Sequence, residues 1–91
     1  MDQRFISRSD GLFLATEEWI PTGYKVQKIG GISIEDIFNT IDTYYGAYNE
    51  FGKIRNYGIY SRQEFLLRRA GAEIREGGLY PISCTLLSNV T

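Results

Sequence analysis

The residue types that most often carry catalysis are scarce in this chain of 91 residues, which contains no histidine and one cysteine, Cys84. Without histidine the chain lacks a general base that titrates near neutral pH and lacks the usual activator of a serine nucleophile. A single cysteine cannot form an internal disulfide, and a catalytic thiol also requires a histidine. We therefore interpret Cys84 as a small buried residue of an apolar strand.

Carboxylates, lysines and glycine pairs are the remaining groups that could support chemistry. Glu17-Glu18 and Glu35-Asp36 are adjacent in sequence, so the two members of each pair face different directions. No cysteine cluster or carboxylate spacing is typical of a metal site, and Gly30-Gly31 and Gly77-Gly78 lack a phosphate-loop pattern. No lysine lies near a glycine-flanked serine on a strand-to-helix turn. We expect no catalytic residue, no metal and no cofactor in this chain.

Composition and charge exclude two classes of partner. Ten Lys and Arg residues face eleven Asp and Glu residues, which gives a formal net charge of −1. A near-neutral chain has no general attraction to nucleic acid or to an anionic membrane surface. No apolar run approaches the roughly 18 residues of a membrane span. We therefore expect no nucleic-acid partner and no membrane span.

An aromatic run is the most unusual feature of the composition. Its members are Tyr44, Tyr45, Tyr48, Phe51, Tyr57 and Tyr60. One interpretation is amphipathic packing, with the phenol hydroxyls directed to solvent. The other is a recognition face for a peptide or glycan, with Arg55 and Arg62 at its edge.

The first part of the chain predicts three short strands. Phe5–Ile6 and Gly11–Thr16 are joined at Ser9-Asp10-Gly11, because Asp-Gly is a strong turn dipeptide. Pro21-Thr22-Gly23 indicates a second turn. Lys25–Ile29 alternates polar and apolar residues, the period of a half-buried strand, and Gly30-Gly31 then turns the chain.

Three helices are predicted next. Ser33 and Asp36 form an S-x-x-D capping box before an apolar stripe at helical spacing, and the helix ends at Gly46. Asn49 is a plausible N-cap for a second helix through Tyr57, closed by Gly58. Ser61-Arg62-Gln63-Glu64 predicts the capping box of a third helix, with Gly71 after its end.

A closing strand, Tyr80–Leu87, completes the order β-β-β-α-α-α-β, typical of an α+β domain. We expect residues 1–91 to form a single domain, a fragment of a longer chain. A chain of this size buries about two-thirds of its unfolded surface, enough for a real but modest core.

The stretch GYKVQKIGGISIEDI, Gly23–Ile37, resembles the strand and turn of PDZ-like domains, usually written G-D-x-I-x-x-I-N-G. The following Tyr44–Phe51 and Ser61–Leu67 resemble the PDZ-like segment of S41-type serine peptidases, the tail-specific or C-terminal-processing enzymes, and of their inactive relatives. The resemblance covers Asp10 to Leu87. Tyr24 stands where PDZ domains usually carry Asp, and Gly30 where they often carry Asn.

The resemblance implies a PDZ-like fold and a ligand groove between the strand Gly11–Thr16 and the helix Ile34–Tyr45. A bound polypeptide would add as an extra strand, and Asp10–Phe13 would take the place of the carboxylate-binding loop. The ligand-binding residues implied in this way are Gly11, Leu12, Phe13, Leu14, Phe38 and Ile41. The alternative is that Leu12, Leu14, Phe38 and Ile41 pack on one another.

The catalytic serine and lysine of S41-type peptidases belong to a separate domain, so no catalytic residue carries over to this chain. We expect a non-catalytic PDZ-like module that binds a polypeptide segment or regulates an adjacent catalytic domain. The resemblance also implies a location in the cell envelope or outside the cell. The alternative function is a structural or homo-oligomerisation module without a ligand groove, with Leu12, Phe13 and Phe38 buried and Tyr48 and Tyr57 at a subunit contact.

Overall fold

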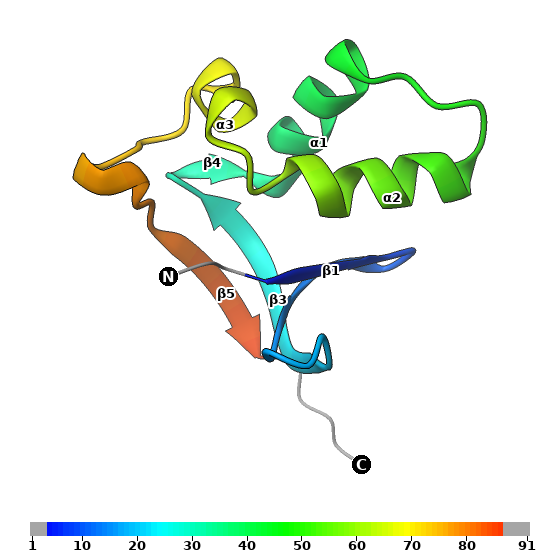
Figure 1. Ribbon diagram of the computed structural model, residues 1–91, viewed down its shortest axis with the longest axis horizontal. Helices are drawn as coiled ribbons and strands as arrows, with labels where there is room; N and C mark the ends of the chain where they lie inside the picture. Colours follow the sequence, from blue (N-terminus) through cyan, green and yellow to red (C-terminus); the bar gives the residue numbers. More distant parts are fainter. Residues whose placement is uncertain (1–3, 87–91) are drawn as a thin grey trace.

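The structure is a computed structural model that describes residues 4–86 as a five-stranded antiparallel sheet with three α-helices (Figure 1). The strands are β1 Phe5–Arg8, β2 Gly11–Ala15, β3 Pro21–Ile29, β4 Ile32–Ser33 and β5 Ile82–Leu86. The helices are α1 Ile34–Tyr44, α2 Glu50–Tyr60, α3 Glu64–Ala70 and the 3₁₀ helix η1 Glu76–Gly78. The predicted α+β class is confirmed, and the predicted order holds except that β4 and η1 are additional.

Strand β3 is the centre of the sheet. It pairs with β2 and β4, and β5 also pairs with it. The predicted turn at Gly30-Gly31 is confirmed, with φ angles of 59° and 82°. Gly30 also receives a close approach, because a Cβ built on it would lie 2.6 Å from the backbone nitrogen of Glu73. That turn therefore needs glycine both for its conformation and for space.

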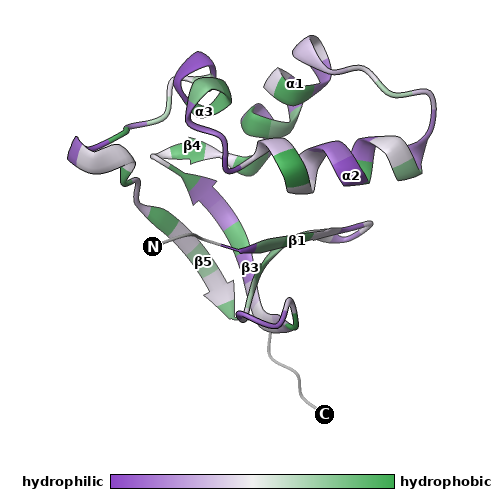
Figure 2. Ribbon diagram, in the orientation of Figure 1, coloured by the Kyte–Doolittle hydropathy of each residue, from purple (hydrophilic) through white to green (hydrophobic). Residues whose placement is uncertain are grey.

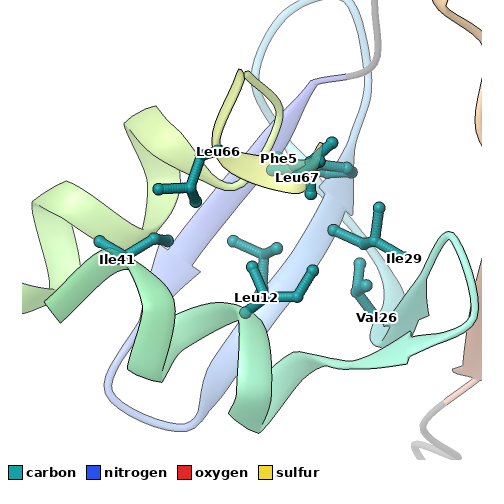
Figure 3. Packing of buried hydrophobic residues seen from close by; sticks show 8 residues of the cluster. Phe5, Leu12, Val26, Ile29, Ile41, Leu66 and Leu67 are labelled. Atoms are coloured by element: carbon teal, nitrogen blue, oxygen red, sulfur yellow. The ribbon is translucent and has the colours of Figure 1, made fainter. Parts of the chain in front are cut away.

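The hydrophobic core lies between the sheet and the helices. Its buried residues come from β1, β2, β3, α1 and α3, and are Phe5, Leu12, Val26, Ile29, Ile37, Ile41, Leu66 and Leu67 (Figure 3). Helix α2 contributes no buried residue. Figure 2 shows hydrophilic and hydrophobic segments alternating along α2. This helix is held at the surface of the domain by partly buried side chains.

The beginnings of the first two helices are formed as predicted. The Ser33 side chain accepts a hydrogen bond from the Asp36 N–H at 3.2 Å, and the Asn49 side chain accepts one from the Gly52 N–H at 2.9 Å. Each side chain satisfies an amide that has no partner within its own helix. Helix α3 ends at Gly71, whose φ of 92° lies in the left-handed region expected after a helix.

The predicted junction between the second and third helices is wrong. Helix α2 continues through Gly58 to Tyr60, and Ser61 closes it by donating its N–H to the Tyr57 carbonyl. Helix α3 then begins at Glu64 after Gln63, without a side-chain cap. Ser61 is fully buried, and its hydroxyl has no hydrogen-bond partner. Packing at the end of α2 therefore prevails over the local capping pattern.

The predicted turn at Pro21-Thr22-Gly23 is also wrong, because these residues open β3. Pro21 is tolerated as the first residue of a strand. The reversal is made instead by 16–20, in which Thr16 exchanges backbone hydrogen bonds with Trp19 and Ile20. Trp19 has a φ of 63° there, the one positive value outside glycine between residues 4 and 86. The last residue of the predicted closing strand, Leu87, lies outside the described residues.

Candidate functional site

A groove of about 610 Å³ lies between the β1–β2 turn, the first turns of α1 and the outer helix α2. This volume is within the usual range for ligand sites in proteins. The β1–β2 turn contributes Arg8 to Gly11, and β3 contributes Lys25. The helices contribute Ile34, Glu35 and Phe38 from α1, and Glu50, Phe51, Lys53, Ile54 and Tyr57 from α2.

Stacked aromatic rings hold α2 beside α1, and one of the two stacked pairs, Phe38 with Tyr57, lines the groove. Phe38 and Tyr57 are parallel, with ring centroids 3.9 Å apart, and Tyr45 and Tyr60 stack at 3.7 Å. The Tyr57 hydroxyl donates a hydrogen bond to Asp42 Oδ2 at 2.9 Å. Helix α2 has no buried residue, so these aromatic contacts stabilise its position on the domain.

The other attachment of α2 is a close approach to strand β1. A Cβ built on Gly58 would lie 3.2 Å from the Cβ of Ser7, so this position has little room for a side chain. The Ser7 hydroxyl is buried there without a hydrogen-bond partner. Gly58 thus allows the last turns of α2 to lie on β1.

The environment of Tyr57 changes its acidity. Burial, followed by the hydrogen bond to Asp42 and the negative charges of Asp42 and Glu50, raises the pKa of Tyr57 from 10.0 to about 12. Each of these influences disfavours the phenolate. Tyr57 therefore keeps its proton, and with it the hydrogen bond from α2 to Asp42 on α1, to a higher pH than an ordinary tyrosine would.

The apolar part of the groove consists of Ile34, Phe38, Ile54 and Phe51. Phe51 is 84 % exposed, an unusual state for a phenylalanine on a helix of a folded domain. A ligand that enters the groove can bury this ring. Tyr48 is fully exposed nearby in sequence but does not line the groove, which makes it a matched control for Phe51.

Lys25 and Gly11 meet at the β1–β2 turn. Gly11 has a φ of 140°, and a Cβ built on it would lie 2.6 Å from Lys25 Cε and 3.3 Å from Lys25 Nζ. The absence of a side chain at Gly11 therefore allows the half-buried Lys25 side chain to lie along the turn. The arrangement places an ammonium group beside the predicted carboxylate-binding loop.

The charged side chains of the groove are of both signs. Arg8 Nε and Asp10 Oδ1 are 3.6 Å apart and more than half exposed, so this pair contributes little to stability. Within residues 4–86, Lys25, Lys53, Glu35 and Glu50 form no ion pair. The groove thus offers two cations and two carboxylates to a ligand, which favours a molecule with mixed charge over a uniformly charged polymer.

The structure separates the six ligand-binding residues implied by the resemblance. Gly11 and Phe38 line the groove. Leu12 and Ile41 are completely buried in the core, Phe13 is 4 % exposed, and Leu14 packs against the core. Leu12, Phe13 and Ile41 are therefore not among the residues that line the groove. Leu12, Leu14, Phe38 and Ile41 pack in one cluster, as the alternative interpretation expects.

The main-chain edge of β2 is not available to a ligand strand. β2 is hydrogen-bonded to β1 on one side and to β3 on the other. Addition of a polypeptide to Gly11–Thr16 as an extra strand is therefore blocked by β1. The predicted groove between β2 and α1 is filled by core side chains, and the observed groove is displaced toward the β1–β2 turn and α2.

The residues that sequence reasoning missed are on α2 and β3. Lys53 and Ile54 belong to the predicted second helix, and nothing in their local pattern places that helix beside the β1–β2 turn. Phe51 is named in the aromatic run as part of a possible recognition face, but without its position at this turn. Gly58 could have indicated it, because a glycine inside a helix often marks a close approach of another backbone. Lys25 fits the polar–apolar alternation of a half-buried strand, which gives no indication of its place at the groove.

Some residues of the aromatic run fit the interpretation as packing, and others are exposed, as a recognition face would require. Tyr45, Tyr57 and Tyr60 are partly buried and pack against the core, whereas Tyr44, Tyr48 and Phe51 are exposed. Arg62 does not border the groove, since its guanidinium lies 5.5 Å from the ring centroid of Trp19.

Cys84 is partly buried and packs against the core, and burial raises the pKa of its thiol. The thiol is therefore mostly protonated at neutral pH, which makes it a poor nucleophile.

The described part of the chain contains neither a metal-binding cluster nor a membrane-spanning helix. Between residues 4 and 86, no cluster of three or more potential metal-ligating side chains occurs. Over the same range, every helix is too short or too polar to span a bilayer.

Comparison with known proteins finds no relative of this chain. The chain matches no family model, no curated protein and no solved structure. The role of the groove therefore has to follow from the residues that line it.

Proposed function

We propose that this chain is a non-catalytic, PDZ-like module of an S41-type peptidase-like protein, and that it binds a polypeptide segment in the groove between the β1–β2 turn, α1 and α2. The segment can belong to a separate protein or to an adjacent catalytic domain that the module regulates. The observation that carries the proposal is the groove itself, with an apolar floor and Phe51 exposed at its wall.

The composition of the groove supports a polypeptide ligand. Ile34, Phe38 and Ile54 provide apolar surface for a side chain. The surrounding charges of both signs that form no ion pair within residues 4–86 are Lys25, Lys53, Glu35 and Glu50. Pockets that bind organic ligands combine an apolar lining with a few polar groups that fix orientation. A polypeptide with an apolar side chain and a charged terminus has both kinds of group.

The position of Lys25 suggests which end of the polypeptide binds near the turn. Its ammonium group lies beside Gly11, next to the Asp10–Phe13 loop. A peptide carboxylate there would form a charge-assisted hydrogen bond with Lys25, while the apolar side chain of the last residue fills the floor of the groove.

Two lysines on the same strand allow a matched test. The probes are short peptides with an apolar last residue, each prepared with a free and with an amidated C-terminus. We expect Lys25→Gln to weaken binding of the free-acid peptides about tenfold, since a hydrogen bond to a charged group is worth about 1.5–3 kcal/mol. Lys28→Gln, on the exposed side of β3 and outside the groove, should leave the affinity unchanged.

Affinity can be measured by isothermal titration calorimetry, with circular dichroism as the check that both variants are folded. Equal effects of Lys25→Gln and Lys28→Gln, or equal affinity for acid and amide peptides, would show that Lys25 does not hold a carboxylate. Absence of binding by every peptide in the set would contradict the proposed function.

A further inference from the structure

The two edges of the sheet differ in what packs against them. At one edge, α2 packs against β1, with Gly58 close to Ser7. At the other edge is β5, and in the described chain β3 is the only element with extensive contacts to it (Figure 1). The outer hydrogen-bonding edge of β5 therefore has no strand partner within residues 4–86.

The sequence of β5 carries none of the usual devices that prevent pairing at an edge. Natural edge strands are commonly protected by charged residues, by proline, or by a bulge in the edge strand itself. The five residues of β5, ISCTL, contain no charged residue and no proline. Leu86 is 57 % exposed, although it lies on the same face of the strand as Ile82 and Cys84, which pack against the core.

The strand is also complementary to itself. If two copies of β5 run antiparallel with Cys84 at the symmetry axis, all five residues of each copy are paired. Ile82 then lies opposite Leu86, and Ser83 lies opposite Thr85. Apolar residues face apolar residues on the helix side of the sheet, and hydroxyl residues face each other on the solvent side, both favourable cross-strand combinations.

We propose that β5 is a homodimerisation edge, at which two copies of this chain join their sheets into one continuous antiparallel sheet. A two-fold axis through Cys84 makes the contact isologous, as a closed dimer requires. The pairing satisfies the outer main-chain groups of β5 and covers Leu86 with Ile82 of the second copy. None of the groove residues belongs to β5, so the contact does not fill the groove, although Lys25 of the groove lies next to Thr85 on the neighbouring strand.

The single cysteine of the chain gives a direct test of the register. Residues directly opposite each other in an antiparallel pair have Cα atoms about 4.5–5.5 Å apart, within the range that a disulfide spans. Sedimentation equilibrium of the 91-residue chain should show a mass that rises toward twice the monomer mass with concentration. Oxidation with copper phenanthroline should then produce a disulfide-linked dimer on a non-reducing gel, which a Cys84→Ser variant does not form.

The neighbours of β5 on β3 allow a variant that separates dimerisation from folding. Ser83 is paired with Lys28 and Thr85 with Lys25 within one copy. Introduced carboxylates therefore face lysines inside the monomer but face each other across the proposed dimer. The double substitution Ser83→Glu with Thr85→Glu should raise the dimer dissociation constant about tenfold or more, because like charges directly opposite each other are destabilising.

The matched control is Ser83→Gln with Thr85→Gln, which has side chains of the same size without charge and should dimerise like the original chain. Circular dichroism melting must show all variants folded. A monomer at every concentration would overturn the proposal. So would a dimer that resists the glutamate pair and forms no Cys84 disulfide, since its contact then lies elsewhere, for example at the exposed Tyr48.

Discussion

Two residues shape the groove in opposite ways: Gly11 lacks a side chain, and Phe51 exposes a large one. Gly11 lies in a backbone conformation that favours glycine, and the space where its side chain would be is occupied by Lys25. Phe51 contributes an aromatic ring to the groove that the domain itself leaves exposed. Between them, these residues provide a charged end and an apolar wall.

Tyr57 lines the groove, and its ionisation makes the stability of the domain depend on pH. Its pKa is about 12 in the folded chain against 10.0 for an ordinary tyrosine. Between these values the folded state retains a proton that the unfolded state loses. The contribution of Tyr57 to stability is therefore complete below pH 10 and is lost as the pH rises toward 12.

We expect Tyr57→Phe to lower the free energy of unfolding by about 1 kcal/mol at neutral pH, because the hydrogen bond to Asp42 is lost. The difference between the two proteins should shrink as the pH is raised from 10 to 12. Urea unfolding at several pH values measures this difference. A gap that stays constant over that range would show that the hydroxyl is not held as a neutral donor.

At the scale of elements, α2 is the part of the fold on which the groove depends most. It has no buried residue and is attached through ring stacking to α1 and through Gly58 to β1. Each glycine inside a helix costs about 1 kcal/mol relative to alanine. Gly58 is retained in the helix because β1 leaves little room beside it.

The close approach at Gly58 can be tested by overpacking. Gly58→Leu should lower the free energy of unfolding by about 1–3 kcal/mol, since a large side chain there must push α2 away from β1. Ile59→Leu, at the neighbouring exposed position of the same helix, should change it by less than about 0.5 kcal/mol. Thermal or urea unfolding compares the two; equal stability of both variants would mean that α2 is not fixed on β1.

The elements that the sequence predicted well are those set by local chemistry. Ser33 and Asn49 accept the amide hydrogen bonds expected of N-caps, and Gly30-Gly31 forms the expected turn. The predictions failed where packing decides. Ser61 resembles an N-cap in sequence, but it is buried at the end of α2 because that helix continues along β1 past Gly58.

The candidate site was only partly predictable for the same reason. The resemblance implies a site that includes Gly11 and Phe38, which line the groove. It also implies Leu12 and Ile41, which instead fill the space between β2 and α1. Phe51 belongs to the aromatic run that the sequence offers as a recognition face, but its place in the groove, like that of Lys53, depends on α2 lying beside a turn about forty residues earlier in the chain. Local sequence patterns do not show which distant segments of the chain lie side by side.

For the whole molecule, the groove and the free edge of the sheet lie on different elements. The groove is built from the β1–β2 turn, Lys25, α1 and α2, whereas within residues 4–86 the edge is formed by β5. Binding of a polypeptide and pairing of two copies are therefore separable. A dimer joined through β5 would carry two grooves without blocking either.

The most direct test of the central claim is a titration of the amide ¹H–¹⁵N NMR spectrum of the chain with free-acid and amidated peptides. If the groove binds a polypeptide end, chemical shifts change at Gly11, Lys25, Phe38, Phe51 and Ile54, and the changes are larger with the free acids. Changes confined to Ile82–Leu86, where a peptide could pair with the edge strand, or no change with any peptide, would contradict the groove as the binding site.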